Sequence, residues 1–449
     1  MIRMSLQEAA QTLGIPPVAA AAGFAGITTD SRRVSSGMMF AALGGEHADG
    51  HDFVSSALAD GATVALVSRK LDLPLPQLVV DDVITALGSL AAKWCADIKP
   101  VVVAITGSNG KTTTKEMVAK ILETNASVLA TSGNYNNELG LPLTLFELNS
   151  NHEFAVLELG ASKAGDIEYL SAICAPGIGL VTNVGPAHLQ GFGNEEGVAR
   201  AKGELYAALP ATGTAIINND ESWVSLWQEM CPAKNHITFG HKPGSDVFPV
   251  HTPNGTKVRT PQGEFELHLH LPGDHNLQNA LAATAVALAL NIPLKQIRAG
   301  LENTQPVPGR LNLVHTQSGW TVIDDTYNAN PASLYAALQV LSLQRGEPWL
   351  VLGDMKELGH GSRKMHAEMG EAARALGVKK IFALGDASKS AIGAFGSGGR
   401  HFDSHAALTE ALCSELRPGV ACLVKGSRSM GMEQVVEAIT DPYPMRETG

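Results

Sequence analysis

The sequence predicts an α/β protein of three domains, and three observations support this. Its 449 residues correspond to about three domains at about 150 residues each. From residue 101 onward, short apolar runs alternate with helix-like segments, which is typical of a parallel sheet covered by helices. A Pro- and Gly-containing stretch at 306–310 separates two such sets. We therefore expect domains at 1–98, 99–309 and 310–449.

The first region is expected to be a small α/β domain. Short strand patterns lie among glycines at 26–45 and 61–69, and a helix-like stretch at 84–98 leads to Pro100. A proline following a helical pattern marks a boundary. This is where we place the end of the first domain.

Eight apolar runs are predicted strands of the two larger domains. Each ends in, or is followed by, glycine or a polar residue, and together they indicate a central parallel sheet and a C-terminal Rossmann-like sheet. They lie at 101–107, 154–160, 177–184, 213–220, 320–325, 348–354, 379–386 and 419–426. A ninth apolar run, at 280–292, is too short for the ~20 residues of a membrane-spanning helix and is predicted to be a buried, alanine-rich helix.

Composition narrows the function classes. The net charge of -11, from 33 basic and 44 acidic residues, argues against nucleic acid as the main partner, because a basic excess is needed to neutralise a phosphate backbone. The five cysteines form no C-x-x-C pair, as expected for reduced thiols. The first residues lack the apolar core of a signal peptide. We expect a cytoplasmic monomer without membrane insertion.

The stretch AITGSNGKTTTKEM at 104–117 predicts a phosphate-binding loop between a strand and a helix. Glycines let backbone N–H groups turn toward an anion, the lysine reaches terminal phosphates, and the threonine hydroxyl can ligate Mg²⁺. The usual motif places a glycine five residues before Gly110, where this chain has Ile105. The match is thus to a shorter G-x-x-G-K-T form; a mere turn is the alternative. The candidate ligands are Gly107, Ser108, Asn109, Gly110, Lys111, Thr112 and Thr113.

Three further residues are candidates for a metal shell around ATP, since Mg²⁺ prefers oxygen ligands. Glu158 ends a predicted strand, and His188 follows the next strand along the chain. Each is otherwise an ordinary loop residue. Lys202 lies in a helix-like segment and would be a solvated lysine unless its amine were neutral and had captured CO₂ as a carbamate.

The later part of the chain adds polar groups suited to a nucleotide. Asn276 and Asn279 are three residues apart on one predicted helical face and could read a base edge or cap the helix. Arg310 could clamp a phosphate with its planar guanidinium. The stretch DDTYNANP at 324–331 is too polar for a core and suits ribose and base contacts.

Polar residues gather where the predicted strands end. Ligands of open α/β sheets bind at the carboxyl ends of the strands, although such ends are loops and often polar in any case. The residues are Glu158, Asn183, Asp324, Asp325, Asp354, Asp386 and Lys425.

Together these motifs resemble the Mur ligase family, ATP-dependent amide ligases that build the peptide stem of bacterial peptidoglycan. The resemblance covers nearly the whole chain and is carried, in order, by TGSNGKTTTKEM, LELGAS, TNVGPAHLQGFG, AKGE, GDHNLQNALAA, VPGRLN and DDTYNANP. It is nearest to the branch that adds D-alanyl-D-alanine to UDP-N-acetylmuramoyl-tripeptide, through TSGNYNNELGLPLTL, GDMKELG and KGSRSMGME. The D-N-P-R stretch usual in the sister branch that adds the third residue does not occur in this chain.

The resemblance implies a fold, a mechanism and a set of roles. ATP would phosphorylate the terminal carboxylate of the UDP-linked peptide, and the dipeptide amine would displace phosphate. The N-terminal domain would hold the UDP-sugar, and the central domain would be the P-loop ATPase. Mg²⁺ would be held by Thr112, Glu158, His188 and carbamylated Lys202, and the nucleotide would also meet Lys111, Asn276, Asn279, Arg310, Asp325 and Tyr327. Expected substrate contacts are Asp30, Ser31 and His51 for the UDP-sugar, Asn134 and Asn137 for the peptide, and Asp354, Glu357, Ser427 and Arg428 for the dipeptide.

Three other functions remain open from the sequence. A nucleotide switch, a small-molecule kinase and a family member that adds another amino acid would each carry the same phosphate loop. For the ligase, a site divided among three domains predicts closure by a hinge near Pro308 and Gly309.

Overall fold

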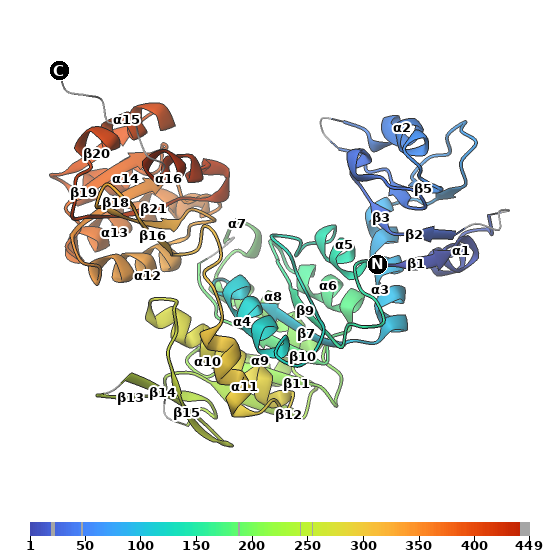
Figure 1. Ribbon diagram of the computed structural model, residues 1–449, viewed down its shortest axis with the longest axis horizontal. Coiled ribbons are helices and arrows are strands. Elements are labelled where there is room, and N and C mark those ends of the chain that lie inside the picture. Colours follow the sequence, from blue (N-terminus) through green and yellow to red (C-terminus); the bar gives the residue numbers. More distant parts are fainter. Residues whose placement is uncertain (19–22, 46–47, 187–188, 243, 254, 441–449) are drawn as a thin grey trace.

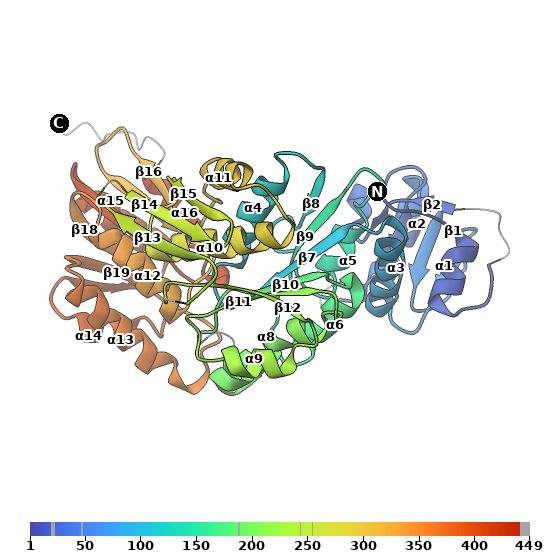
Figure 2. The same ribbon diagram turned by 90° about the horizontal axis from the view of Figure 1, so that it is seen from below.

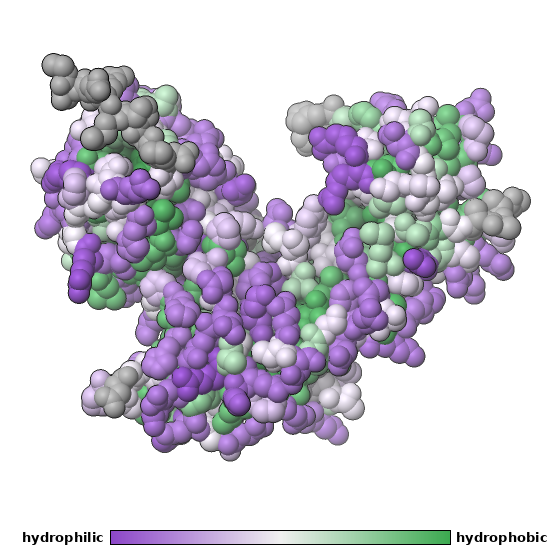
Figure 3. Space-filling model, viewed as in Figure 1, coloured by the Kyte–Doolittle hydropathy of each residue, from purple (hydrophilic) through white to green (hydrophobic). Residues whose placement is uncertain are grey.

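The computed structural model describes the chain from residue 1 to 440 except residues 19–22, 46–47, 187–188, 243 and 254. The N-terminal and C-terminal regions lie at opposite ends of the central domain (Figure 1). From the same side, the molecular outline is hollowed between these two regions, above the central domain (Figure 3). The predicted three-domain α/β architecture is confirmed.

The N-terminal region packs around two apolar cores. Its four-stranded parallel sheet has the order β3-β4-β5-β6, and a small core covers one of its faces. The other face of this sheet, a two-stranded antiparallel ribbon and two helices belong to a core that the central domain shares, and α3 lies between that domain and the sheet (Figure 2). The elements are β1 (Arg3–Ser5), α1 (Leu6–Leu13), β2 (Gly23–Ala25), β3 (Ile27–Thr28), β4 (Met39–Ala41), α2 (Val54–Ala59), β5 (Val64–Val67), β6 (Gln77–Val79) and α3 (Val83–Ile98).

Helix α3 joins the N-terminal region firmly to the central domain. Asp82 caps its N-terminus by accepting from the Thr85 N–H at 2.9 Å, which satisfies one of the free donors of the first turn. On its other side, the Trp94 indole donates to the Leu148 carbonyl at 3.2 Å. The helix is therefore fixed to the central domain although it ends just before the predicted division at 98.

The central domain is built on a six-stranded parallel sheet of order β12-β11-β10-β7-β9-β8. Helices α4 and α10 pack together over one face, with alanines of α10 in the core. The elements are β7 (Val101–Thr106), α4 (Lys111–Leu122), β8 (Val128–Ala130), α5 (Gly140–Leu145), β9 (Phe154–Glu158), α6 (Asp166–Cys174), β10 (Ile178–Val181), α7 (Leu189–Phe192), α8 (Glu195–Ala207), β11 (Thr214–Asn218), α9 (Val224–Met230), β12 (Asn235–Phe239), α10 (Asp274–Ala289) and α11 (Leu294–Glu302).

A three-stranded antiparallel sheet interrupts this domain before α10. Its strands are β13 (Phe248–Thr252), β14 (Gly255–Thr260) and β15 (Gly263–Leu267). None of these three strands was among those predicted from apolar runs. Most of its side chains are exposed or half-buried, so the continuous apolar runs that mark a buried strand do not occur there.

The C-terminal domain has a second six-stranded sheet, of order β16-β17-β21-β18-β19-β20, in which only β16 is antiparallel. Apolar clusters cover both faces, as expected for a parallel sheet. The elements are β16 (Asn312–His315), β17 (Thr321–Asp325), α12 (Pro331–Ser342), β18 (Glu347–Gly353), α13 (Ser362–Ala375), β19 (Lys380–Leu384), α14 (Lys389–Phe395), β20 (Gly399–Phe402), α15 (His405–Glu415), β21 (Val420–Lys425) and α16 (Glu433–Thr440).

All eight strands predicted from apolar runs are confirmed, and the alanine-rich run lies in buried α10. Within the part of the chain that the structure describes, no helix is both long and apolar enough to span a bilayer.

The connection between the central and C-terminal domains has an unusual backbone. Gly309 has φ 74° and Leu311 has φ 51°, a region that a branched side chain rarely adopts. The Leu311 N–H donates to Asp325 Oδ1 at 3.2 Å, and the Gly309 N–H donates to Asp324 Oδ2 at 3.1 Å. Two carboxylates of β17 thus hold the connection in this conformation, next to the predicted hinge.

Candidate active site

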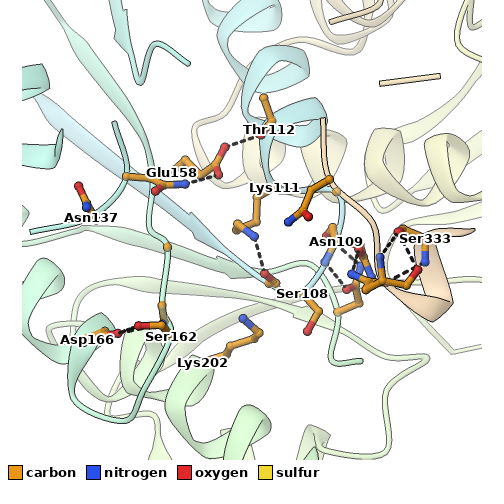
Figure 4. Close-up of a pocket in the computed structure, with 18 of the residues that line it drawn as sticks. Ser108, Asn109, Lys111, Thr112, Asn137, Glu158, Ser162, Asp166, Lys202 and Ser333 are labelled. Atoms are coloured by element: carbon orange, nitrogen blue, oxygen red, sulfur yellow. Dashed lines mark hydrogen bonds between the residues drawn. The ribbon is translucent and has the colours of Figure 1, made fainter. Parts of the chain in front are cut away.

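A cleft of about 1130 Å³ lies where the central and C-terminal domains meet. Its central-domain wall is the loop after β7 and the ends of β9 and β10, and its C-terminal wall is the connection and the loop after β17. Figure 4 shows Lys111, Thr112, Glu158 and Lys202 around this space, with Ser333 entering from the other domain. The carboxyl ends of both sheets therefore face one cavity.

The loop between β7 and α4 leaves room only for glycine at two positions. A Cβ on Gly107 would lie 1.8 Å from Thr182 Oγ1, and one on Gly110 would lie 2.3 Å from Asn279 Oδ1. Both residues also have positive φ, 151° and 80°. The close approach of neighbouring polar side chains explains both glycines, and α4 begins immediately after them, with its N-terminus directed at the cleft.

Asn109 anchors this loop to the end of β10. Its N–H donates to Asn183 Oδ1 at 2.9 Å, and its carbonyl accepts from Thr182 Oγ1 at 2.6 Å and from Asn183 Nδ2 at 3.0 Å. Ser108 Oγ donates to the Gly185 carbonyl at 3.2 Å. The loop is therefore held in shape by the protein itself.

Lys111 lies along the inside of the loop. Its Nζ donates to the Gly107 carbonyl at 2.9 Å. Burial lowers its pKa; the Glu158 carboxylate opposes this shift and the Arg310 cation adds to it. A cation near two further basic groups and one carboxylate is well placed to meet a multiply charged anion.

Thr112 and Glu158 form the oxygen-rich part of the site. The Thr112 hydroxyl donates to Glu158 Oε2 at 2.7 Å, and Asn136 Nδ2 donates to Glu158 Oε1 at 2.7 Å (Figure 4). Glu158 is only 2% exposed. A hydroxyl and a carboxylate in contact are the donor set Mg²⁺ accepts when phosphates and waters complete its shell, so these residues fit the ion.

The described residues contain no group of three or more His, Cys, Asp or Glu side chains that could hold a metal by themselves. His188, the predicted imidazole ligand, lies outside the described residues. A site with one carboxylate agrees with Mg²⁺ in phosphate chemistry rather than with a cage made only by protein.

Lys202 is not the solvated lysine that its sequence context suggests. It lies in α8, is 3% exposed, and its amine points toward the Lys111 side of the cleft (Figure 4). Burial, and secondarily the charge of Lys111, lowers the pKa of Lys202 well below its ordinary value. Its surroundings therefore shift the Lys202 amine toward the neutral form.

Asn276 and Asn279 lie at the start of α10 and are nearly buried. Asn276 Nδ2 donates to the Pro272 carbonyl at 2.8 Å, and Asn279 Nδ2 donates to Asn276 Oδ1 at 3.2 Å. The Asn279 carbonyl lies against Gly110. Both side chains line the cleft, and Asn279 lies beside the phosphate loop. The predicted base contacts stay a prediction.

The C-terminal wall carries its own cations. The Arg310 guanidinium lies 4.0 Å from the centre of the Tyr327 ring, and its buried Nε has no hydrogen-bond partner among the described residues. Asp325 is bonded to the Leu311 N–H and to Lys425. Burial raises the pKa of Asp325, and Lys425 opposes this shift. Arg310 thus lines the cleft and keeps one buried donor without a partner among the described residues, while the Asp325 oxygens are engaged within the protein.

One hydrogen bond joins the phosphate loop directly to the C-terminal domain. Asn330 Nδ2 donates to Asn109 Oδ1 at 2.8 Å. Asn330 also caps α12 by accepting from the Ser333 N–H at 2.9 Å, and Pro331 begins the helix. The cap of one domain's helix therefore contacts the other domain's loop.

Several predicted substrate residues do not line this cleft. They are Asp30, Ser31, His51, Asn134, Asp354, Glu357, Ser427 and Arg428, whereas Asn137 does line it. His51 is buried, with its Nδ1 bonded to Asp49 Oδ1 at 2.6 Å and its Nε2 accepting from the Ser68 N–H at 3.0 Å. In this conformation both of its ring nitrogens serve the fold.

The predicted dipeptide residues do gather in one place on the C-terminal domain. The Ser427 N–H donates to the Asp354 carbonyl at 3.1 Å, and Ser427 Oγ accepts from the Lys356 N–H at 2.8 Å. Glu357 has φ 64°. The loops after β18 and β21 thus form one surface, separate from the cleft as the structure stands.

Among the lining residues outside the predicted set, four bond to the central groups of the site. Asn136, Asn183, Asn330 and Lys425 line the cleft and bond to its central groups. Asn183 and Lys425 stand at strand ends, so the strand-end pattern already marked them. Asn330 lies in the polar stretch at 324–331 and Asn136 lies in TSGNYNNELGLPLTL, but neither residue ends a predicted strand, and their contacts arise only in the folded chain.

Comparison with known proteins agrees with this geometry. Three family models match: the Mur ligase family catalytic domain at residues 23–101, the Mur ligase middle domain at 105–287 and the Mur ligase glutamate ligase domain at 309–428. A UDP-N-acetylmuramoyl-tripeptide–D-alanyl-D-alanine ligase of Escherichia coli is 42% identical over 92% of this chain and 93% of its own length.

Two solved structures extend the comparison. A crystal structure of MurF from Acinetobacter baumannii matches with a TM-score of 0.91 at 37% identity, over 98% of this chain and 99% of that one. MurF ligase from Thermotoga maritima in complex with ADP matches with a TM-score of 0.82 at 29% identity, over 92% and 96%.

Proposed function

This chain belongs to the Mur ligase family, and from that premise we propose that it joins D-alanyl-D-alanine to UDP-N-acetylmuramoyl-tripeptide with cleavage of ATP. The product would be the UDP-linked pentapeptide used for peptidoglycan. The observation that carries the proposal is the meeting of Lys111, Lys202 and Arg310 with the Thr112–Glu158 pair in one cleft between two domains. Such a site suits a triphosphate and a second, anionic reactant.

Phosphorylation of a carboxylate is the expected first step. A carboxylate is a poor electrophile, because its leaving group would be an oxide. Attack of one carboxylate oxygen on the γ-phosphorus gives an acyl phosphate and ADP. The dipeptide amine then adds to the acyl carbon, loses a proton, and expels phosphate to leave the amide. ATP cleavage thereby becomes part of bond formation.

Lys111 and Arg310 are the groups that meet the transferring phosphoryl group in this proposal. Catalysis of phosphoryl transfer rests on positioning and on cations that stabilise the spread negative charge. Lys111 lies inside the loop, and Arg310 lies across the cleft with a buried Nε that no described residue contacts by a hydrogen bond. The two cations would approach the phosphates from opposite domains.

Thr112 and Glu158 would hold Mg²⁺, which would supply positive charge that offsets the negative charge of the phosphates. In Lys202, a neutral amine can add to CO₂ to form a carbamate with release of one proton. Burial of Lys202 supports this modification, and the resulting anion would offset the cations around it. The imidazole of His188 stays a predicted ligand.

The UDP-linked peptide and the dipeptide are expected to bind residues of all three domains. Asp30, Ser31 and His51 for the UDP-sugar, Asn134 and Asn137 for the peptide, and Asp354, Glu357, Ser427 and Arg428 for the dipeptide remain predictions. Since most of them lie away from the cleft, reaction would require closure near Pro308 and Gly309. Closure also removes water that would hydrolyse an acyl phosphate. We expect these steps in a cytoplasmic monomer.

The test follows phosphate release and product mass together. Purified protein is mixed with ATP, Mg²⁺, UDP-N-acetylmuramoyl-tripeptide and D-alanyl-D-alanine, and each substrate is omitted in turn. We expect phosphate only with both substrates and a mass gain of one dipeptide. Phosphate release indifferent to both would contradict the proposal and favour a nucleotide switch, and a stable phosphorylated product would favour a kinase. Turnover with a different amine would keep the family and change the branch.

A further inference from the structure

Lys115 is a buried lysine for which the proposed chemistry has no use. It lies in α4, three residues after Thr112, and is 1% exposed. Residues three apart on a helix lie on one face, so Lys115 and Thr112 project from the same side. A buried ammonium is costly unless it is paired and hydrogen-bonded. What it contacts therefore indicates what it does.

The Lys115 ammonium is bonded to the first residue of the loop after β8. Its Nζ donates to the Thr131 carbonyl at 2.6 Å and pairs with the Glu116 carboxylate. Thr131 in turn accepts the Glu158 N–H on its hydroxyl at 3.0 Å. Lys115 thus fixes the residue that supports the backbone of Glu158.

The same loop returns to Glu158 a few residues later. Asn136 Nδ2 donates to Glu158 Oε1, and the Gly160 N–H donates to the Asn136 carbonyl at 2.8 Å. A Cβ on Gly160 would lie 2.8 Å from Asn136 Oδ1. The Glu158 carboxylate is therefore held from both sides, by Thr112 on one oxygen and by the loop on the other.

We propose that Lys115 is a positioning residue, which holds the loop at 131–137 so that Asn136 orients the Glu158 carboxylate for Mg²⁺. This inference rests on the proposed function. The loop also carries Asn134 and Asn137, the predicted peptide contacts. Through Lys115 the helix that starts at the phosphate loop and the loop that faces the peptide form one unit, so the carboxylate at the nucleotide and the peptide contacts are set together.

The alternative is a buried ion pair that only stabilises the fold. The two roles differ in what they change. A stabilising pair affects the melting temperature, whereas a positioning residue also changes the Mg²⁺ requirement. Partners that orient a metal ligand typically contribute about 10- to 100-fold in metal affinity or activity.

The experiment compares Lys115→Met with Lys120→Met, a matched control. Lys120 lies on the same helix, pairs with Glu123 and is exposed at its side chain. We expect Lys115→Met to raise the Mg²⁺ concentration for half-maximal activity and to lower kcat/KM by about 10- to 100-fold. Lys120→Met should leave both unchanged. ADP affinity measured in EDTA should be unchanged in both, since the phosphate loop is intact. Lys115→Gln replaces Lys115→Met if the latter does not fold.

A double-mutant cycle and hydrogen exchange complete the test. If Lys115 acts through Asn136, the pair Lys115→Met and Asn136→Ala should lose no more activity than the worse single variant, and amides at 131–140 should exchange faster in Lys115→Met. Additive losses, or a lower melting temperature with unchanged Mg²⁺ dependence, would overturn the proposal. An inactive wild type would contradict the proposed function instead, while hydrogen exchange would still report on the loop.

Discussion

The two walls of the cleft are built differently. On the central-domain wall, Thr112 is hydrogen-bonded to Glu158 at the end of β9, and Asn109 is hydrogen-bonded to two residues that follow β10. On the C-terminal wall, Arg310 lies over an aromatic ring, its Nε has no hydrogen-bond partner in the part of the chain that the structure describes, and its neighbour Leu311 has positive φ. The described contacts between the walls include a single direct bond, from Asn330 to Asn109. One wall is preorganised within a single domain, and the other is supplied by a second domain.

This difference teaches how the proposed chemistry is divided. Groups that meet a nucleotide throughout the cycle gain from rigidity, since preorganised charges need no rearrangement during reaction. Groups that complete the site only after both substrates bind can lie on a domain that moves. The four predictions below test this division, from the largest expected effect to the smallest.

Removal of the Lys111 cation should abolish most of what the central-domain wall contributes to catalysis. In Lys111→Met we expect kcat/KM to fall by about 10³-fold or more, as for other cations that stabilise a transferring phosphoryl group. Steady-state phosphate release with both substrates is the measurement, and Lys120→Met is again the control. A loss of less than tenfold would show that Lys111 does not meet the phosphates.

The wall on the C-terminal domain is tested by Arg310→Lys. This variant keeps the charge but removes the planar fork and the stacking on Tyr327. We expect kcat to fall by roughly 10²-fold, with little change in ADP affinity measured by fluorescence titration. Equal losses in kcat and in ADP affinity would mean that Arg310 binds nucleotide in the ground state, and the division between the walls would fail.

His275 reports whether the walls face each other in solution. Burial, and then the Lys425 cation across the cleft, lowers its pKa to about 4 from an ordinary value near 6.5. Between these two pH values His275 is protonated in the unfolded chain but not in the folded chain. The free energy of unfolding should therefore fall as the pH drops from about 6.5 toward 4, by up to about 3 kcal/mol.

NMR titration of labelled histidine and urea unfolding at several pH values would check this. In Lys425→Met the pKa of His275 should rise, and in His275→Gln the pH dependence of stability should be weaker. An unchanged His275 pKa in Lys425→Met would show that the two residues are apart in solution.

The Asn330–Asn109 bond should have the smallest effect. Asn330→Ser keeps an oxygen that can cap α12 but loses the amide donor to Asn109. We expect the KM for ATP to rise by a few fold, because one hydrogen bond contributes about 1 kcal/mol, while the melting temperature stays close to that of the wild type. Asn330→Ala removes the cap as well and should also lower the melting temperature. Identical behaviour of the two variants would contradict a separate role for the cross-domain bond.

The cleft residues of the central-domain wall could be predicted from the sequence, whereas the residues that hold them in place could not. Lys111 and Thr112 belong to a phosphate-loop motif and Glu158 ends an apolar run, so the sequence alone indicates their roles. All three line the cleft. Lys115 and Asn136 have no such mark, since their roles come from contacts between α4, the loop after β8 and Glu158. Lys202 was misjudged from spacing alone because burial, which lowers its pKa, is a property of the folded chain.

The fold shows the same limit. Continuous apolar runs indicate buried strands, and the eight strands predicted from such runs are present. Sheet β13–β15 alternates too weakly for prediction because few of its side chains are buried. The shared core of α3 and the central domain could not be read from a boundary at 98, since packing between helices distant in sequence leaves no local pattern.

The most direct test of the account follows oxygen from substrate to phosphate. UDP-N-acetylmuramoyl-tripeptide labelled with ¹⁸O in its terminal carboxylate is turned over with ATP, Mg²⁺ and D-alanyl-D-alanine, and the released phosphate is analysed by mass spectrometry. Activation as an acyl phosphate predicts one ¹⁸O atom in each phosphate released, because the carboxylate oxygen leaves with the phosphoryl group. Phosphate without ¹⁸O would show that ATP is cleaved by water and would contradict the account.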